Sequence, residues 1–356
     1  MARMRLRVGV IAIIVMILAS VGGWAVSRTQ SDARAPLSQA LDVLPVDTRA
    51  AGFTDWAQIR TTLGFDEVTS AIDRKTLVNN ASERDLSSRS VFEASTDDMN
   101  AKFGWTIADL RWEAYGQASN GALLAAGLND SLEAGTVTSG LRDLGYVQNG
   151  DTWTIDSADL AVKVPGLPTT FANIAFLEDE RLILLSDQAR YLDRALTMHR
   201  DHAASLAGVA AVRQTATPLV GALTAVIQVG KDACEATGLA GMPATVQAQG
   251  RNTVKPLGKL EPVAYGARAM FDNDGDQWLR FSLTFDSAVQ ATRQLELRRA
   301  LSTGPFVGRN GQIGDVLTLT GGHTSGPNTT LDFGLDATRG AFMSGNGPLL
   351  FAACSS

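Results

Sequence analysis

The sequence predicts an α+β protein in which an N-terminal transmembrane helix precedes an ectodomain of two related halves, with mainly antiparallel sheets and packed helices. Three observations support this class. An apolar run follows a group of arginines at the N-terminus, the only two cysteines lie far downstream of it, and a succession of strand, helix and hairpin turn occurs twice. The first two features concern location, and the third concerns the fold.

Residues 8–26 form a run of 19 residues without a charge. As a helix this run spans roughly 28 Å, which is enough for a hydrocarbon core of about 30 Å. Arg3, Arg5 and Arg7 precede it, and positively charged residues stay on the cytoplasmic side of a membrane. We therefore expect residues 1–7 in the cytoplasm and residues 8–26 as a transmembrane helix.

Cleavage of this segment is an open alternative. Gly23 and Ala25 supply the small residues that a signal peptidase requires, so a cut after Ala25 fits the pattern. However, the run is longer than the apolar region of a usual signal peptide, and Trp24 suits the outer membrane interface. These features favour a retained signal anchor, followed by a polar linker at 27–43.

Charge and composition limit the partners of the ectodomain. The whole chain has a net charge of −6, but residues 1–28 contain four arginines and no acid, so the remainder has 27 basic and 37 acidic residues and a net charge of −10. An acidic ectodomain is a poor binder of nucleic acid. The hydrophobic content of 45% and charged content of 19% are typical of a folded domain. We expect the plasma membrane as a partner and no nucleic acid.

Cys234 and Cys354 are the only cysteines, and both follow the apolar run. An even number of cysteines in an oxidising compartment favours a disulfide. Such a bridge closes a loop of about 120 residues and stabilises by about 4 to 5 kcal/mol in the chain-entropy model. Two separate buried thiols are the alternative. A metal site is disfavoured because neither cysteine has a ligand-type neighbour at short spacing.

The ectodomain is expected to begin with a strand at 50–53 and a helix capped by Thr54. Trp56, Ile59 and Leu63 follow at the spacing of one helical face, and Gly64 marks the helix end. We expect this face to lie in the core.

An internal duplication is the main prediction about the fold. The strand 121–128 precedes a helix that Asp130 and Glu133 are expected to cap, and the strand 279–285 likewise precedes a helix. Asn149-Gly150 follows the first helix and Asn310-Gly311 follows the second, each a hairpin-type turn. A recurrence of common motifs without duplication is the alternative.

Further along, 174–187 matches 331–344 as a strand, a polar turn and a second strand. The predicted division of the ectodomain is a first half at 44–230, a connection at 231–262 and a second half at 263–356.

No group of residues predicts a catalytic, cofactor-binding or metal-binding site. His199 and His202 have the spacing of a metal pair on a helix, but no third ligand accompanies them. Asp272, Asp274 and Asp276 resemble the start of a calcium loop, yet Asp274-Gly275 fits a hairpin turn better. Ser344 and Ser325 lack the surroundings of a catalytic serine.

Three segments carry a resemblance to known proteins: 44–64, with LPVDTRAAGFTDWAQIRTTLG; 103–117, with FGW and DLRWEAYGQ; and 181–196, with RLILLSDQARYLDRAL. The chain resembles uncharacterised single-pass membrane-anchored envelope proteins of actinobacteria, and a family of unknown function built from duplicated strand–helix modules. The resemblance implies an envelope location and no particular reaction.

These observations predict a single-pass plasma-membrane protein whose C-terminal domain is extracytoplasmic. We expect it to act without catalysis as a binding or accessory protein of the cell envelope, with an envelope lipid or a membrane protein as partner and a role in lipid or glycolipid handling as one hypothesis. Two alternatives stay open: an envelope hydrolase or transferase, which needs acids of raised pKa in a cleft, and a sensory or structural ectodomain.

Overall fold

The computed structural model describes residues 35–65, 67–335, 342–343 and 347–354. The apolar run at 8–26 lies outside these residues. Within the described part of the chain, no helix combines the length and the apolarity that crossing a bilayer requires.

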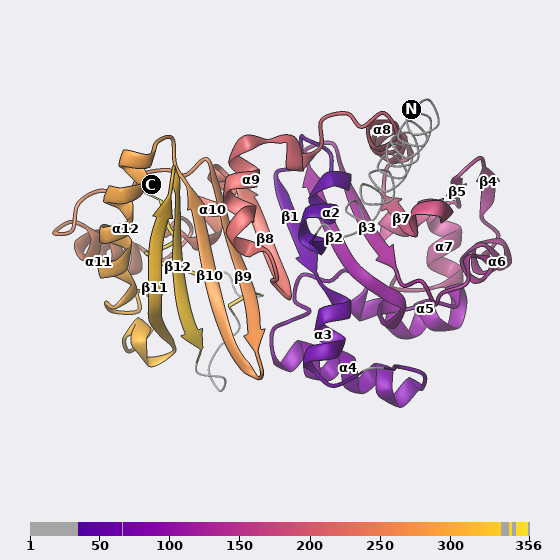
Figure 1. Cartoon of the computed structure of the whole chain (residues 1–356), viewed down its shortest axis with the longest axis horizontal. Helices are drawn as coiled ribbons and strands as arrows, with labels where there is room; N and C mark the ends of the chain where they lie inside the picture. The colour runs from indigo at the N-terminus through magenta and orange to yellow at the C-terminus, as the bar shows by residue number, and fades with distance from the viewer. Residues whose placement is uncertain (1–34, 66, 336–341, 344–346, 355–356) are drawn as a thin grey trace, which may run out of the picture. The chain divides into compact units, whose positions relative to one another are not determined.

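A single antiparallel sheet of twelve strands organises the described residues (Figure 1). Its order is β11-β12-β10-β9-β8-β1-β2-β3-β7-β6-β5-β4. The strands are β1 (Ala50–Thr54), β2 (Leu110–Ala118), β3 (Gly121–Leu128), β4 (Val147–Asn149), β5 (Thr152–Thr154), β6 (Asn173–Leu177), β7 (Leu182–Ser186), β8 (Thr224–Val229), β9 (Tyr265–Asn273), β10 (Asp276–Thr284), β11 (Leu317–Ser325) and β12 (Asn328–Leu335). The α+β class with an antiparallel sheet is therefore confirmed.

Helices cover both faces of this sheet. They are α2 (Pro36–Val43), α3 (Trp56–Thr62), α4 (Ala71–Glu83), α5 (Thr96–Phe103), α6 (Ala134–Leu144), α7 (Ser157–Lys163), α8 (Ala189–Arg200), α9 (Ala210–Ala216), α10 (Gly230–Thr237), α11 (Ala244–Val254) and α12 (Ala288–Ser302). One core contains the apolar faces of α2, α8 and α9. A second core contains those of α3, α5, α6 and α12 together with the C-terminal residues 349–353, and a small third cluster contains Ala233, Val263, Leu283, Phe285 and Ala291. Alternation along β3 explains the two cores, because Leu123 and Ala125 belong to one and Leu124 and Ala126 to the other.

Two runs of the sheet share one connectivity. Outward from the central pair of β1 and β8, one side reads β1-β2-β3-β7-β6 and the other reads β8-β9-β10-β12-β11. On each side a hairpin follows the first strand, a helix (α6 or α12) follows the hairpin, and a later hairpin returns so that its last strand lies beside the third strand. On the β1 side, the hairpin of β4 and β5 and helix α7 intervene before this returning hairpin. This observation agrees with the repeated strand, helix and hairpin pattern of the sequence.

The connectivity changes one detail of that pattern. The hairpin of β6 and β7 corresponds to β11 and β12, whereas the sequence comparison paired 174–187 with 331–344 and so aligned β6 with β12. Both strands are apolar, and apolar periodicity alone does not say which arm of a hairpin a strand forms.

Two expected helix starts shift along the chain. Asp55, not Thr54, caps α3 by accepting a hydrogen bond from the backbone N–H of Gln58 at 2.9 Å, because Thr54 is the last residue of β1 and pairs with both neighbouring strands. In α6, Glu133 is the N-cap residue and no side chain caps the helix. The C-terminal part of the predicted linker at 27–43 is helical, because α2 spans Pro36–Val43. Its buried residues are Leu37, Ala40, Leu41 and Val43.

Candidate functional site: a basic groove beside the disulfide

A half-open groove of about 220 Å³ lies between α11, the segment 255–260 and the C-terminal residues 350–354. We call it the basic groove. Its apolar lining comes from Leu239, Val254, Leu260, Leu350 and Ala353, and its cationic lining comes from Arg251, Lys255 and Lys259. Cys354 also lines it. The groove therefore joins an apolar floor to a positively charged rim.

Glycines allow the chain to approach itself closely here. A Cβ atom at Gly250 would lie 2.4 Å from Cδ1 of Leu239, so a larger residue there would require the leucine side chain to shift. Gly258 has a φ of +125°, a conformation that side chains rarely adopt, in the turn after α11. The turn presents Lys255 and Lys259 on either side of Leu257, which is 42% exposed.

The disulfide fixes one wall of the groove. Cys234 on α10 and Cys354 are bonded, with their Cα atoms 5.1 Å apart. Nearby, the backbone N–H of Leu349 donates to the carbonyl of Thr237, and the Thr237 hydroxyl donates to the carbonyl of Ala352. The predicted bridge is thus present, and it ties the C-terminal residues to the middle of the chain.

A buried arginine holds the two walls together. Arg298 of α12 is fully buried and donates to the carbonyls of Phe351 and Ala353, each at 2.8 Å, and to the carbonyl of Glu261 at 3.3 Å. Its guanidinium lies 5.3 Å from the ring centre of Phe285. Burial lowers the pKa of Arg298 to about 9, because a charge is poorly solvated there. Arg298 is thus a positioning residue between segment 255–261 and the C-terminal residues.

The charges of the rim contrast with the rest of the chain, which is acidic overall. Lys259 lies 4.0 Å from Glu261 and is 72% exposed, so this contact is weak. Arg251 donates to the side chain of Gln247 at 3.4 Å. Among the described residues, three cations and no acid line the groove, which makes it suitable for an anion with an apolar extension.

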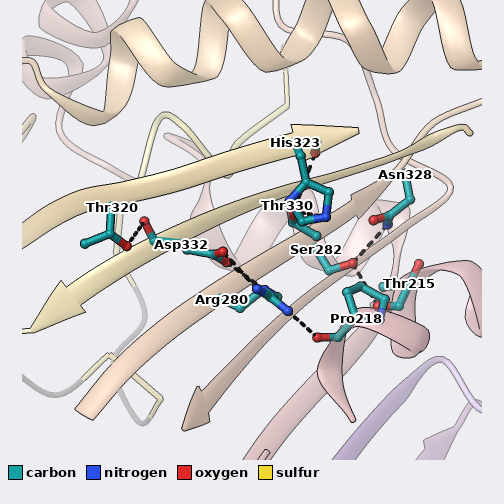
Figure 2. A network of polar contacts seen from close by, with 9 residues as sticks. All are labelled: Thr215, Pro218, Arg280, Ser282, Thr320, His323, Asn328, Thr330 and Asp332. Atoms are coloured by element: carbon teal, nitrogen blue, oxygen red, sulfur yellow. Dashed lines mark hydrogen bonds and ion pairs between the residues drawn. The ribbon is translucent and has the colours of Figure 1, made fainter. Parts of the chain in front are cut away.

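A second polar arrangement lies on β10, β12 and α9 (Figure 2). Arg280 binds both carboxylate oxygens of Asp332, at 2.6 and 2.8 Å, and donates to the carbonyl of Pro218 at 2.8 Å. Close by, Asn328 donates to the hydroxyl of Ser282, which donates to the carbonyl of Thr215. The contacts to the carbonyls of Pro218 and Thr215 join the α9 region to β10, and the other contacts join β10 to β12. The side chains of this arrangement are therefore engaged in holding α9 and the two strands together.

The residues weighed for metal or serine chemistry do not converge. Nε2 of His199 lies 2.6 Å from Glu180, whereas His202 lies beyond the end of α8 with a φ of +49°. His323 contacts the hydroxyl of Thr330 in the hairpin of β11 and β12, which Figure 2 shows, and Ser344 lies outside the described residues. In the part of the chain that the structure describes, no group of three or more His, Cys, Asp or Glu could hold a metal ion.

The aspartates near 272–276 form the expected hairpin. Asp274 and Gly275 have φ values of +52° and +99°, which suits the tight turn between β9 and β10. Asp272 accepts from the backbone N–H of Gly275 and from Arg84. The Asp272 carboxylate is therefore engaged by the turn of the hairpin and by Arg84, which follows α4.

The acids Glu113 and Asp109 have raised pKa values, and their hydrogen bonds hold neighbouring segments of the fold in place. Burial raises the pKa of Glu113, which accepts hydrogen bonds from Trp56 at 3.0 Å, from Ser90 at 2.6 Å and from the backbone of Val91 and Phe92. Asp109 has a pKa raised by burial and caps a short helical turn through Thr106. Neither acid lines the basic groove.

Sequence reasoning missed the basic groove and Arg298. The groove combines residues 239–260 with 350–354, which are distant in the chain. Arg298 had one usable signal: it follows Gln294 and Leu295 and precedes Leu301 at helical spacing, on the buried face of α12. A charged residue within an apolar helical stripe marks a buried charge that needs carbonyl or carboxylate partners.

Comparisons with known proteins identify no family for this chain. No protein-family model and no curated protein matches it. Among solved structures, crystal forms I, III and IV of TP0453 are similar, with 8% identity and TM-scores of 0.40, 0.38 and 0.42. The matches cover 85%, 84% and 88% of this chain and 93%, 95% and 98% of those chains. They indicate a distant likeness in chain path, and we rest no argument on it.

Proposed function

We propose that the protein is a membrane-anchored, extracytoplasmic binding protein that holds an anionic amphiphile in the basic groove. The amphiphile places its carboxylate or phosphate against Arg251, Lys255 and Lys259, and its apolar part on Val254, Leu260 and Leu350. The observation that carries the proposal is the combination of these cations with an apolar floor in a chain that is otherwise acidic.

The size of the groove limits the ligand. Its volume of about 220 Å³ is below the roughly 300 to 1,000 Å³ of pockets that enclose a drug-sized molecule. A single alkyl chain near its polar end fits such a half-open space, whereas a whole two-chain lipid does not. We infer that the rest of a larger amphiphile stays outside the groove.

The disulfide and the predicted anchor support the location. A bridge between Cys234 and Cys354 persists in an oxidising compartment. The apolar run at 8–26 with its preceding arginines orients the described residues to that side. Exposed Leu257 between two lysines suits contact with an anionic bilayer, from which the groove takes its ligand.

Photo-cross-linking tests the site. The full-length chain in nanodiscs of zwitterionic lipid is exposed to a fatty acid that has a diazirine in its alkyl chain, and the labelled peptides are identified by mass spectrometry. We expect labelling at 239–260 and 349–354, and weaker labelling by the uncharged methyl ester. Equal labelling by the ester, or labelling spread over the exposed surface, would contradict the proposal.

Paired variants sharpen the test. Lys255→Ala with Lys259→Ala removes two rim cations, each worth about 1 kcal/mol toward an anionic partner, so the half-saturating concentration rises about 30-fold. Lys75→Ala with Lys102→Ala removes the same charge at exposed positions outside the groove. This control should leave the half-saturating concentration unchanged. Val254→Trp fills the groove and blocks labelling, whereas Val289→Trp, at a valine that is 69% exposed, does not.

A further inference from the structure

Two arginines that do not line the basic groove lie close together over the centre of the sheet. Arg268 is on β9, opposite Val226 of β8, and Val226 is opposite Gly52 of β1. Arg89, from the segment after α4, covers Gly52: a Cβ atom there would lie 3.6 Å from Cβ of Arg89. The two arginines therefore lie on the same face of the sheet, over positions of β9 and β1 that are separated by one strand, β8.

Several donors of this pair have no acceptor. Arg268 is 5% exposed and donates through Nη2 to the carbonyl of Met343 at 3.2 Å. Nε of Arg268, and Nε and Nη2 of Arg89, are inaccessible to solvent and have no hydrogen-bond partner in the described part of the chain. An unsatisfied buried donor costs about 1 to 3 kcal/mol, and more when it is charged, so such donors call for an acceptor.

Among the residues that the structure describes, one acid acts on both arginines. Asp85 is the acid that acts on both arginines, and its carboxylate accepts from the backbone N–H of Met343. The adjacent Arg84 binds Asp272. Burial lowers the pKa of Arg89, and burial followed by repulsion from Arg89 lowers the pKa of Arg268 to about 10. Within the described ranges, the two cations thus share the Asp85 carboxylate in a poorly solvated place.

A small space adjoins Arg268. It has a volume of about 20 Å³ and lies among β8, β9, β10 and α10, with Ala352 at one side. About 10 to 15 Å³ by this measure is enough for one water molecule, so the half-open space has room for one water molecule or a single small ion. Its other polar lining residues are Gln228 and Thr237, and the Thr237 hydroxyl donates to the carbonyls of Ala233 and Ala352.

We propose that Arg268, assisted by Arg89, binds a single halide-sized anion, chloride being the usual one, in this space. The anion accepts from Nε of Arg268 and adds the negative charge that the arginine pair lacks. Arg89 does not line the space, and it contributes its positive charge from a longer distance. The proposal is independent of the basic groove.

Thermal unfolding of the full-length protein tests this site. At constant ionic strength, replacing gluconate by chloride or bromide should raise the Tm by about 2 to 5 °C with saturation, as expected for a ligand that binds the folded state alone. Arg268→Met should abolish this dependence. Arg309→Met, at an exposed arginine that stacks on Phe306, should preserve it. A Tm that does not depend on halide in the wild-type protein overturns the proposal.

Crystallography with bromide provides a second measurement that needs no variant. Anomalous density is expected beside Nε of Arg268, at a hydrogen-bonding distance, in crystals of the full-length protein grown with bromide. A water molecule there, without anomalous density at saturating bromide, overturns the proposal even where the Arg268→Met protein fails to fold.

Discussion

Asp55 combines helix capping with burial, and the two effects oppose each other at neutral pH. It is 8% exposed and caps α3 through the backbone N–H of Gln58. Burial raises its pKa from 3.8 to about 6, although the hydrogen bond and Arg60 act in the other direction. The folded state therefore binds the proton more tightly than the unfolded state.

This raised pKa predicts a pH-dependent stability. The contribution of Asp55 increases as the pH falls through about 6 and is complete below about 4, because the protonated form avoids the burial of a charge. Between pH 7 and pH 4.5 the gain is about 2 kcal/mol. Urea unfolding at both pH values should show it as a change in the difference between wild-type and Asp55→Asn, which keeps a capping oxygen. A constant difference would contradict the raised pKa.

Arg298 shows what sequence reasoning at single residues omits. Its place on the apolar stripe of α12 could be deduced from spacing, but its acceptors are backbone carbonyls of Glu261, Phe351 and Ala353. Carbonyl acceptors leave no trace in residue identity. The bond between Cys234 and Cys354 could be predicted, because an even number of cysteines in the sequence itself indicates a disulfide.

The C-terminal segment is the element on which the basic groove depends. Removing the disulfide with Cys234→Ala and Cys354→Ala should lower the free energy of unfolding by about 4 kcal/mol, since the bridge closes a long loop. Locally, amide hydrogen exchange should accelerate at 349–354 and the half-saturating concentration of the fatty-acid probe should rise. Amides of β3 serve as the internal control. Unchanged exchange at 349–354 would show that the hydrogen bonds of Arg298 and Thr237 hold the segment without the bridge.

Predictions from the sequence were most accurate for elements that local residues determine. The Asp274-Gly275 turn and the hairpin of β6 and β7 were predicted correctly, because turn residues and apolar runs decide them locally. The predictions of helix N-caps were less accurate. Thr54 and Asp55 are both good capping residues, and Asp55 caps the helix because Thr54 pairs with β2 and β8. That pairing is a tertiary effect, which spacing does not reveal.

At the scale of the whole molecule, the repeated pattern in the sequence indicated two similar runs of strands but not that they share one sheet. The central pairing of β1 with β8 unites them, and no local signal specifies it. The resemblance to actinobacterial envelope proteins and the boundaries at 230 and 262 stay predictions.

The orientation of the whole molecule is testable with fusions at the C-terminus of the full-length chain. Alkaline phosphatase, which needs disulfides, should be active, and a green fluorescent protein that folds only in the cytoplasm should be dark. A chain without residues 8–26 should reverse both results. Phosphatase that is inactive in the full-length fusion would remove the basis for an extracytoplasmic role.

The central strand pair also has a consequence for how the protein is made. The hydrogen bond from the hydroxyl of Thr224 to the carbonyl of Phe53 spans 171 residues, so β1 gains its second neighbour only after most of the chain has been synthesised. Such distant pairing folds slowly. Until β8 arrives, β1 presents an unpaired edge that can capture other chains. If the chain is exported as proposed above, it reaches the far side of the membrane with this edge unpaired, and we expect a chaperone there to limit its aggregation.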